Sequence, residues 1–193
     1  MLHRLRLGLP VVAILFVGTA GAEVYQVDSE HSSVAFSIRH LVSRTSGNFH
    51  EFSGTINYDA GHPEKTQVEA RIQAASIDTD NQRRDDHLRS GDFLEVEKYP
   101  TIGFTSTNTE VKAGVLQLTG KFTMHGVTKT ITLPVKVLGI GTHPRRKVSV
   151  AGFETATVLK RSEYGVNSWT DAARVLGDEV KISIIIEALG VGE

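Results

Sequence analysis

The sequence predicts an all-β domain of about eight strands with one short polar helix. Polar and apolar residues alternate with a period of two over most of the chain, as they do in strands with one face toward a core. Only one segment, near residues 79–91, has the composition and boundary residues of a helix. The chain has no Cys, and it shows no internal repeat or linker-like stretch. One domain, stabilised by packing alone, is therefore expected.

The expected strands follow one another along the chain. The first is residues 24–27, and in the second Val34, Phe36 and Ile38 share one face. Further alternating segments lie at 52–58, 68–74, 102–104, 116–122, 131–137, 153–159 and 180–188. The last of these is the most regular, which favours a long strand late in the chain.

The helix is expected to begin at a Thr79 or Asp80 cap and to end at Gly91. It is strongly polar and offers little apolar surface. We therefore expect it to lie over an opening or an edge of the sheet, where ion pairs hold it. The following turn must end near Tyr99, because Pro100 disfavours helix in the residue before it.

Residues 1–22 have the pattern of a cleavable signal peptide. Arg4 and Arg6 precede an apolar run at 7–17, and small residues, Ala20-Gly21-Ala22, form a cleavage site. The run is shorter than the roughly 20 apolar residues that a spanning helix needs. Export is therefore expected, with residues 23–193 as the mature domain.

Composition excludes several classes of chemistry. The formal net charge is −1 and no basic stripe is present, so nucleic acid is not an expected partner. Without Cys there are no thiol nucleophiles, Cys-ligated zinc sites or iron–sulfur clusters. The histidines show neither H-x-H nor H-E-x-x-H spacing. We therefore expect no metal, no cofactor and no catalytic residue.

Strands with one apolar face can form either a two-sheet sandwich or a closed barrel, and periodicity does not separate the two. If about eight strands close, the interior can hold one small ligand in a tunnel about 25 Å long. The inward residues would then be the binding site. The apolar face predicts Val34, Phe36, Ile38, Phe52, Ile56, Ile72, Phe104, Leu116, Leu118, Phe122, Ile131, Leu133, Phe153, Ile182, Ile184 and Ile186 as this cavity set.

Five patches of sequence resemble one known family, the YceI-like polyisoprenoid-binding proteins, between about Tyr25 and Ala188. The patches are Asp28, His31-Ser32, Val34, Phe36 and His40; Gly47, Phe49 and Phe52-Ser53-Gly54, similar to the second strand; Arg84 to Ser90 with Asp92-Phe93, Tyr99-Pro100 and Phe104; Leu118-Thr119-Gly120 through Met124 to Lys129; and Arg161, Tyr164-Gly165-Val166 and Gly177 to Val180. Leu94 and Glu95 depart from the pattern, where the family often has Phe and Asp.

The resemblance implies an extended, lipocalin-like antiparallel barrel, so that residues 23–193 would be a YceI-like lipid-binding domain. It implies an apolar interior that holds a long isoprenoid chain, commonly in a bacterial periplasm. It implies no reaction. The expected function is thus non-enzymatic binding, with transport or storage, of a polyisoprenoid or similar lipid such as a prenyl quinone or prenyl phosphate. Transient contact with a membrane surface and a homodimer are compatible with this function.

A barrel that buries a lipid tail needs polar groups where the head group lies. The residues expected at this polar mouth are His40, Arg84, Asp85, His87, Arg161 and Trp169. An alternative is an enzyme that acts on a lipid or quinone through polar residues of the mouth such as His40, Arg84, Asp85, His87 or Arg161, although no G-x-S-x-G motif accompanies them. In another interpretation Arg84 and Asp85 only tie the helix to the barrel rim, and Trp169 only plugs one end. A ligand-free sandwich with an interaction role is the third alternative.

Overall fold

The structure is a computed structural model that describes residues 21–169 and 175–191. The strands are β1 (Glu23–Val27), β2 (Ser33–His40), β3 (Ser43–Phe49), β4 (Phe52–Tyr58), β5 (Gln67–Gln73), β6 (Ile77–Asp78), β7 (Thr101–Lys112), β8 (Val115–Met124), β9 (Val127–Thr142), β10 (Ser149–Lys160) and β11 (Leu176–Gly190). The one α-helix of the described residues is α1 (Gln82–Arg89), and the 3₁₀ turns are η1 (Ser29–His31), η2 (Pro63–Lys65), η3 (Ala74–Ser76) and η4 (Arg161–Tyr164). Residues 1–20 of the expected signal peptide lie outside the described part.

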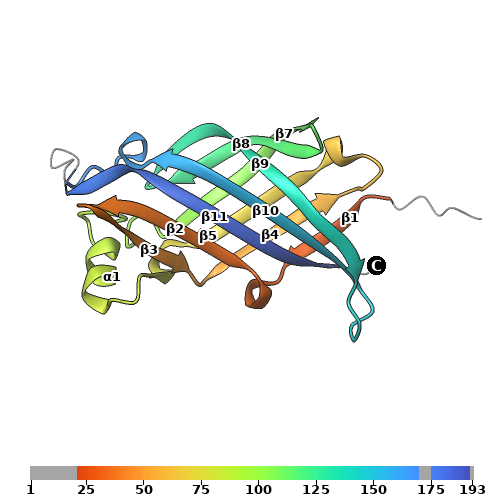
Figure 1. Cartoon of the computed structure of the whole chain (residues 1–193), viewed down its shortest axis with the longest axis horizontal. Helices are drawn as coiled ribbons and strands as arrows, with labels where there is room; N and C mark the ends of the chain where they lie inside the picture. The colour runs from red at the N-terminus through yellow and green to blue at the C-terminus, as the bar shows by residue number, and fades with distance from the viewer. Residues whose placement is uncertain (1–20, 170–174, 192–193) are drawn as a thin grey trace, which may run out of the picture.

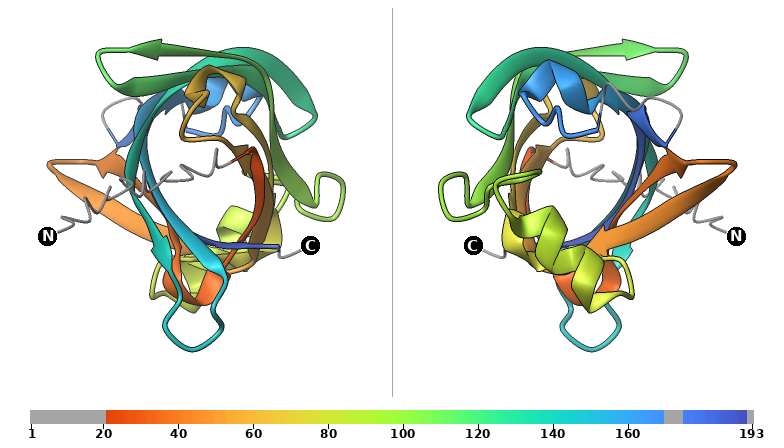
Figure 2. Two further views of the ribbon diagram at one scale, coloured as in Figure 1. Left: turned by 90° about the vertical axis from the view of Figure 1, so that its right-hand side faces the viewer. Right: turned by 90° about the vertical axis from the view of Figure 1, so that its left-hand side faces the viewer.

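Eight strands close into an antiparallel barrel in the order β1-β4-β5-β7-β8-β9-β10-β11. The ring is completed where β1 pairs with the end of β11, with Tyr25 opposite Gly190 and Val27 opposite Ala188. Figure 1 shows the long strands crossing the molecule obliquely, and Figure 2 shows the ring end-on. The expected all-β class is confirmed, and closure decides for the barrel over the sandwich.

Along one of its edges, strand β11 pairs with two different strands, β1 and β2. Its last residues pair with β1, whereas its first part pairs with β2, for example Ile182 with Phe36. The turn η1 lies between β1 and β2, so the two strands pair with successive parts of β11 and are separated only by this turn. The ribbon β2-β3-β6 therefore belongs to the same sheet but lies outside the closed ring.

This ribbon corrects one expectation from the sequence. Residues 47–54 were expected on one strand, but β3 ends at Phe49 and β4 begins at Phe52. The chain changes partners at this point, because β3 pairs with β2 and β6 while β4 pairs with β1 and β5. The alternation alone did not identify β3 or β6 as separate strands.

Two-residue turns join the central hairpins. Ala113-Gly114 connects β7 to β8 and His125-Gly126 connects β8 to β9, and all four residues have positive φ angles between 50° and 77°. Turns of this left-handed kind match the twist of the strands that they join, and Gly adopts them without steric cost.

The helix α1 lies at the end of the barrel where β2 turns into β3 (Figure 1). Its cap is Asn81, whose side chain accepts a hydrogen bond from the backbone nitrogen of Arg84 at 3.0 Å. The expected cap at Thr79 or Asp80 was therefore wrong by one or two residues, because Thr79 is engaged by the helix's own side chains. Among the described residues, no helix is long and apolar enough to span a membrane.

Candidate functional site

The barrel contains an elongated cavity of about 830 Å³. Side chains from every strand of the ring reach it, together with residues of β2, β3, β6 and α1. Alternate residues of each strand point inward, so the apolar face of each sequence segment becomes the cavity wall. The volume falls within the range of ligand-binding pockets, about 300–1,000 Å³.

All sixteen residues of the predicted cavity set line this cavity. The face assignment was open to a one-residue error, which would have turned these side chains outward. Instead, Ile182, Ile184 and Ile186 face inward, whereas Ile185 is 44% exposed. This result concerns position only, and the binding role of the set remains a prediction.

The two ends of the barrel interior differ in packing. Tyr25, Tyr58, Ala151 and Ala188 belong to the buried core cluster but not to the cavity lining, and they fill the end near β1 and the close of β11. The rings of Tyr58 and Phe153 meet edge to face, with centroids 5.7 Å apart. Tight packing of this kind leaves no room for a ligand. The accessible part of the interior is therefore the part toward α1.

Inward residues toward α1 are only partly buried. On β11 Val180, Ile182 and Ile184 keep part of their surface accessible, although they point into the barrel. An apolar side chain inside a filled core would be almost completely buried. Partial exposure on the inner face thus identifies unfilled apolar space.

Five of the six residues expected at the polar mouth line the cavity, namely His40, Arg84, His87, Arg161 and Trp169. His87, Phe93 and Trp169 form an aromatic group there, with ring centroids 5.0 to 6.2 Å apart. The Nε2 atom of His87 lies 2.9 Å from a carboxylate oxygen of Asp92. Aromatic and polar side chains therefore meet at the α1 end of an otherwise apolar cavity.

Asp85 is the exception, because the structure places it outside the cavity wall. It is buried, and its carboxylate accepts hydrogen bonds from the backbone nitrogen and the hydroxyl of Thr79. Arg84 donates to the same residue, from Nε to the hydroxyl oxygen and from Nη2 to the carbonyl oxygen, both at 2.7 Å. These bonds tie α1 to the residue after β6, as the rim-anchoring interpretation expects.

Arg161 is 4% exposed and holds three backbone carbonyl groups. Its Nε atom donates to Gly177, and Nη1 donates to Val166 and Ser168, at 2.7 to 3.0 Å. Burial lowers the pKa of this guanidinium, with Asp178 opposing the shift. Among the described residues, Nη2 is buried without a hydrogen-bond partner. The bonds of Nε and Nη1 thus fix the connection between β10 and β11.

Three residues of the enzyme alternative have separate hydrogen-bond partners. Asp85 binds Thr79, His87 pairs with Asp92, and Arg161 is bound to carbonyl groups. A catalytic arrangement requires a base within hydrogen-bond reach of a nucleophile or of a second positioned group. The hydrogen bonds of these three residues serve separate structural tasks.

Several cavity residues were not in the predicted set. Val68, Val135, Leu159 and Val180 continue faces that the alternation had already identified. Phe49, Ile77, Phe93, Leu94, Met124, Val166 and Leu176, in contrast, lie on short strands, turns and strand ends. Alternation does not find residues on turns and very short strands or at the ends of longer strands, because too few regularly alternating residues surround them.

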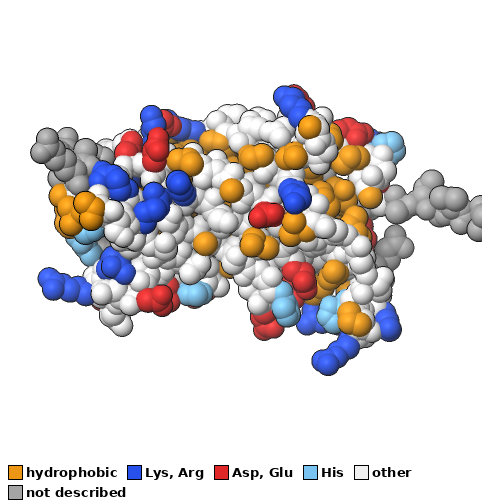
Figure 3. All heavy atoms as spheres, viewed as in Figure 1, with side chains coloured by type: hydrophobic (Ala, Val, Ile, Leu, Met, Phe, Trp, Pro, Cys, Tyr) orange, Lys and Arg blue, Asp and Glu red, His pale blue; other side chains and the backbone are white. Residues whose placement is uncertain are grey.

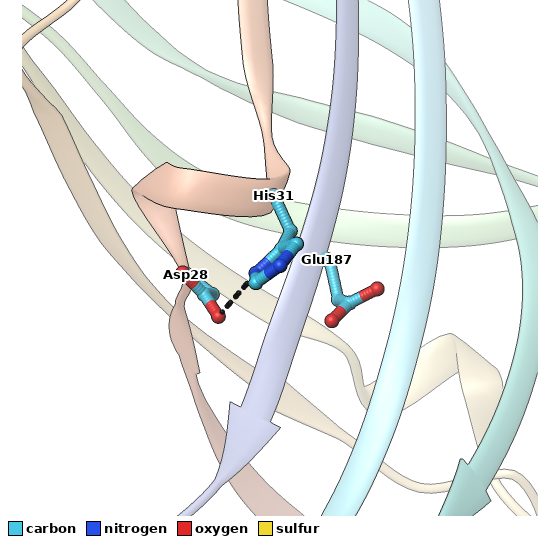
Figure 4. Close-up of side chains that lie close together, drawn as sticks. All are labelled: Asp28, His31 and Glu187. Atoms are coloured by element: carbon cyan, nitrogen blue, oxygen red, sulfur yellow. Dashed lines mark hydrogen bonds and ion pairs between the residues drawn. The ribbon is translucent and has the colours of Figure 1, made fainter. Parts of the chain in front are cut away.

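The barrel brings together one group of potential metal ligands that sequence spacing does not reveal. Asp28, His31 and Glu187 offer ligand atoms within 4.8 Å of one another, and Figure 4 shows the three side chains beside η1 and β11. Asp28 already caps η1 by accepting from the nitrogen of Glu30, and its other oxygen lies 3.0 Å from Nδ1 of His31. Capping and ion pairing account for this arrangement.

A closed antiparallel barrel around an apolar cavity defines a binding barrel, of the lipocalin-like type expected for a hydrophobic ligand. Residues 25–188 match the family model of the YceI-like domain. The chain belongs to the YceI-like family.

Individual relatives agree with this assignment. The chain is 36% identical over 187 residues to Protein YceI of Salmonella arizonae, covering 95% of this chain and 96% of the relative. In fold it is similar to BcnA of Burkholderia cenocepacia, with a TM-score of 0.77, 24% identity, and coverage of 83% of this chain and 98% of that one. It is also similar to a polyisoprenoid binding domain of Saccharophagus degradans, with a TM-score of 0.66, 15% identity, and coverage of 86% and 98%.

Proposed function

We propose that this protein binds the chain of a polyisoprenoid or similar long-chain lipid in its barrel, without catalysing a reaction. The observation that carries the proposal is the apolar cavity of about 830 Å³ inside a closed barrel. The S. degradans domain, which shares the fold, is named for polyisoprenoid binding, and the YceI-like family is one of binding domains. We also propose export to the periplasm, because residues 1–22 have the pattern of a signal peptide.

Energetics favour a carrier over a permanent store. Burying each CH₂ group from water is worth about 0.8 kcal/mol, so a long tail would reach the practical limit of affinity, about −20 kcal/mol. The competing environment of such a lipid, however, is a membrane that is equally apolar. The net free energy of transfer from bilayer to barrel is then close to zero, and a lipid can move in either direction.

The direct test is native mass spectrometry of the protein isolated from its own cells. A bound mass of lipid size is expected, and extraction identifies its tail and head group. Protein that carries no adduct, and that takes up no prenyl lipid from detergent micelles, would contradict the proposal.

A matched pair of variants tests the location of the ligand. Ile184→Trp puts a large side chain into the cavity, whereas Ile185→Trp puts the same side chain on the outer face of β11. Uptake is expected to fall for the first variant and to stay unchanged for the second. Equal uptake by the two variants would place the ligand outside the barrel.

A further inference from the structure

The α1 end of the barrel exposes large apolar side chains. Leu41 and Val42 form the turn between β2 and β3, with relative exposures of 52% and 104%, and Trp169 is 50% exposed. Figure 3 shows hydrophobic side chains gathered at this end of the molecule. Exposed aliphatic and aromatic groups that adjoin one another are a mark of contact with a partner or a membrane.

The hairpin that carries this turn is basic. Residues 31–50 contain no Asp or Glu, and Arg39 lies directly opposite Arg44 across the two strands. Arg44 donates to the carbonyl oxygen of Ser37 at 2.7 Å, and Arg39 donates to that of Leu41 at 3.1 Å. The guanidinium group of Arg44 is therefore held near the apolar turn, on a hairpin without acidic residues, and this charge is complementary to an anionic surface.

The turn adjoins the accessible end of the cavity. His40 pairs with Leu176, and both residues line the cavity. The backbone nitrogen of Leu41 donates to the carbonyl oxygen of Val175 at 2.7 Å. Trp169 belongs to the cavity wall and also contacts His87. The exposed apolar groups and the cavity thus share one end of the barrel.

We propose that this end docks on the surface of a lipid bilayer with anionic head groups. Leu41 and Val42 insert between the lipids, Arg44 contacts the head groups, and Trp169 lies at the interface, where Trp side chains are favoured. The proposal rests on the proposed function, since docking brings the cavity to the membrane that supplies or receives its lipid.

The opposite end supplies a matched control. It also exposes aliphatic side chains, with Leu138 at 49% and Ile140 at 48%, and the basic turn 145–147 lies beside them. The interior at that end, however, is filled by the core around Tyr25 and Tyr58. In the part of the chain that the structure describes, the α1 end alone combines an apolar turn on a basic hairpin with an accessible cavity.

The test measures sedimentation with vesicles of phosphatidylcholine alone or mixed with phosphatidylglycerol. The Leu41→Ser/Val42→Ser variant is expected to bind the mixed vesicles at least about tenfold more weakly than the parent protein. Arg44→Gln is expected to weaken binding to mixed vesicles only, and Leu138→Ser/Ile140→Ser to leave it unchanged. Loss of binding in the Leu138/Ile140 variant instead, or binding that ignores vesicle charge, would overturn the proposal.

Trp169 provides a second readout, because the chain has one Trp. Its fluorescence is expected to shift to the blue on mixed vesicles and to be quenched by brominated acyl chains. Unchanged fluorescence on vesicles that bind the protein would contradict the geometry. If light scattering shows a dimer in solution that the Leu41/Val42 variant abolishes, the turn is a contact between copies of the chain and the docking proposal fails.

Uptake of prenyl lipid from detergent micelles separates this inference from the proposed function. The Leu41/Val42 variant should take up micellar lipid as the parent protein does, while its transfer of lipid between vesicles slows. A parent protein that binds anionic vesicles but takes up no lipid would refute the proposed function and leave the docking surface standing. If the Leu41/Val42 variant no longer sediments with vesicles but still transfers lipid between them at the parent rate, docking through this turn is not needed for transfer and the docking proposal fails.

Discussion

The carboxylate of Asp85 accepts two hydrogen bonds from Thr79, one from the backbone nitrogen at 3.0 Å and one from the hydroxyl at 2.5 Å. Both residues are buried. Because Arg84 donates to the same threonine, one residue after β6 holds the only α-helix of the described chain in place. The helix that borders the cavity therefore depends on a polar attachment more than on an apolar face.

Replacing Asp85 should loosen this attachment. Asp85→Ala leaves the Thr79 nitrogen buried and unpaired, and we expect it to lower the free energy of unfolding by about 2–4 kcal/mol. Asp86→Ala is the control, because Asp86 is exposed and makes a surface ion pair with Arg89 at 3.2 Å; its cost should stay below about 1 kcal/mol. Urea unfolding measures both. Similar losses in the two variants would show that the buried bonds do not hold α1.

Two isoleucines of the cavity wall, Ile56 and Ile184, differ in how closely their surroundings are packed. Ile56 is 5% exposed in the core cluster, so Ile56→Ala should cost about 2–5 kcal/mol of unfolding free energy. Ile184 borders the cavity and is only partly buried, so Ile184→Ala should cost about 1 kcal/mol. Thermal and urea unfolding of the ligand-free protein provide the comparison. A cost for Ile184→Ala as large as that for Ile56→Ala would mean that its surroundings are filled.

Substitution of two turn glycines distinguishes the cost of a left-handed backbone from the cost of a steric clash. Gly114 and Gly126 have nearly the same φ, 77° and 74°, but a Cβ at Gly126 would lie 2.5 Å from Cε1 of Tyr99, whereas at Gly114 it would meet nothing within 4 Å. Gly114→Ala should cost about 1 kcal/mol through its left-handed backbone. Gly126→Ala should cost more, because the Tyr99 ring must also move. Equal losses in denaturant unfolding would contradict this difference.

The Asp28–His31 pair should make stability depend weakly on pH. The hydrogen bond that protonated His31 donates to the Asp28 carboxylate raises the pKa of His31 above 6.5 and lowers the pKa of Asp28 below 3.8. Protonated His31 therefore adds stability below pH 6.5 that is lost as pH rises through its folded pKa. Ionised Asp28 adds stability above pH 3.8 that is lost as pH falls through its own folded pKa.

The contribution of the Asp28–His31 pair to the free energy of unfolding should thus be largest between pH 3.8 and pH 6.5. Nuclear magnetic resonance titration of His31 measures the first shift directly, and Asp28→Asn should return the pKa of His31 toward 6.5. A pKa that does not change in this variant would show that the pair does not form in solution.

The cavity wall could be predicted from the sequence because strand geometry is local. Side chains of a strand alternate between its faces, so the order of Ile182, Ser183 and Ile184 already separates inside from outside. Barrel closure is different, since it depends on β1 meeting β11 across more than 160 residues. The resemblance to a known family, and not the alternation, predicted that step.

The division of the interior into a packed end and an accessible end could not be predicted. Ile56 and Ile184 both lie on the predicted inward face of their segments, but of the two only Ile56 lies in the core cluster of the described residues. What differs is the set of side chains across the barrel, such as Tyr58 and Phe153. Nor did the sequence reveal the partner of Asp85, because the decisive donor is a backbone nitrogen.

The core packed around Tyr25 and Tyr58 leaves the α1 end as the accessible opening of the described barrel. On the proposed function, a lipid that enters tail first must leave head first through the same opening. The donor membrane and the acceptor membrane must then contact the same end of the barrel one after the other. One molecule cannot bridge two bilayers and thread its cargo through, so delivery requires the loaded protein to detach, cross the intervening water and turn the same face to its destination.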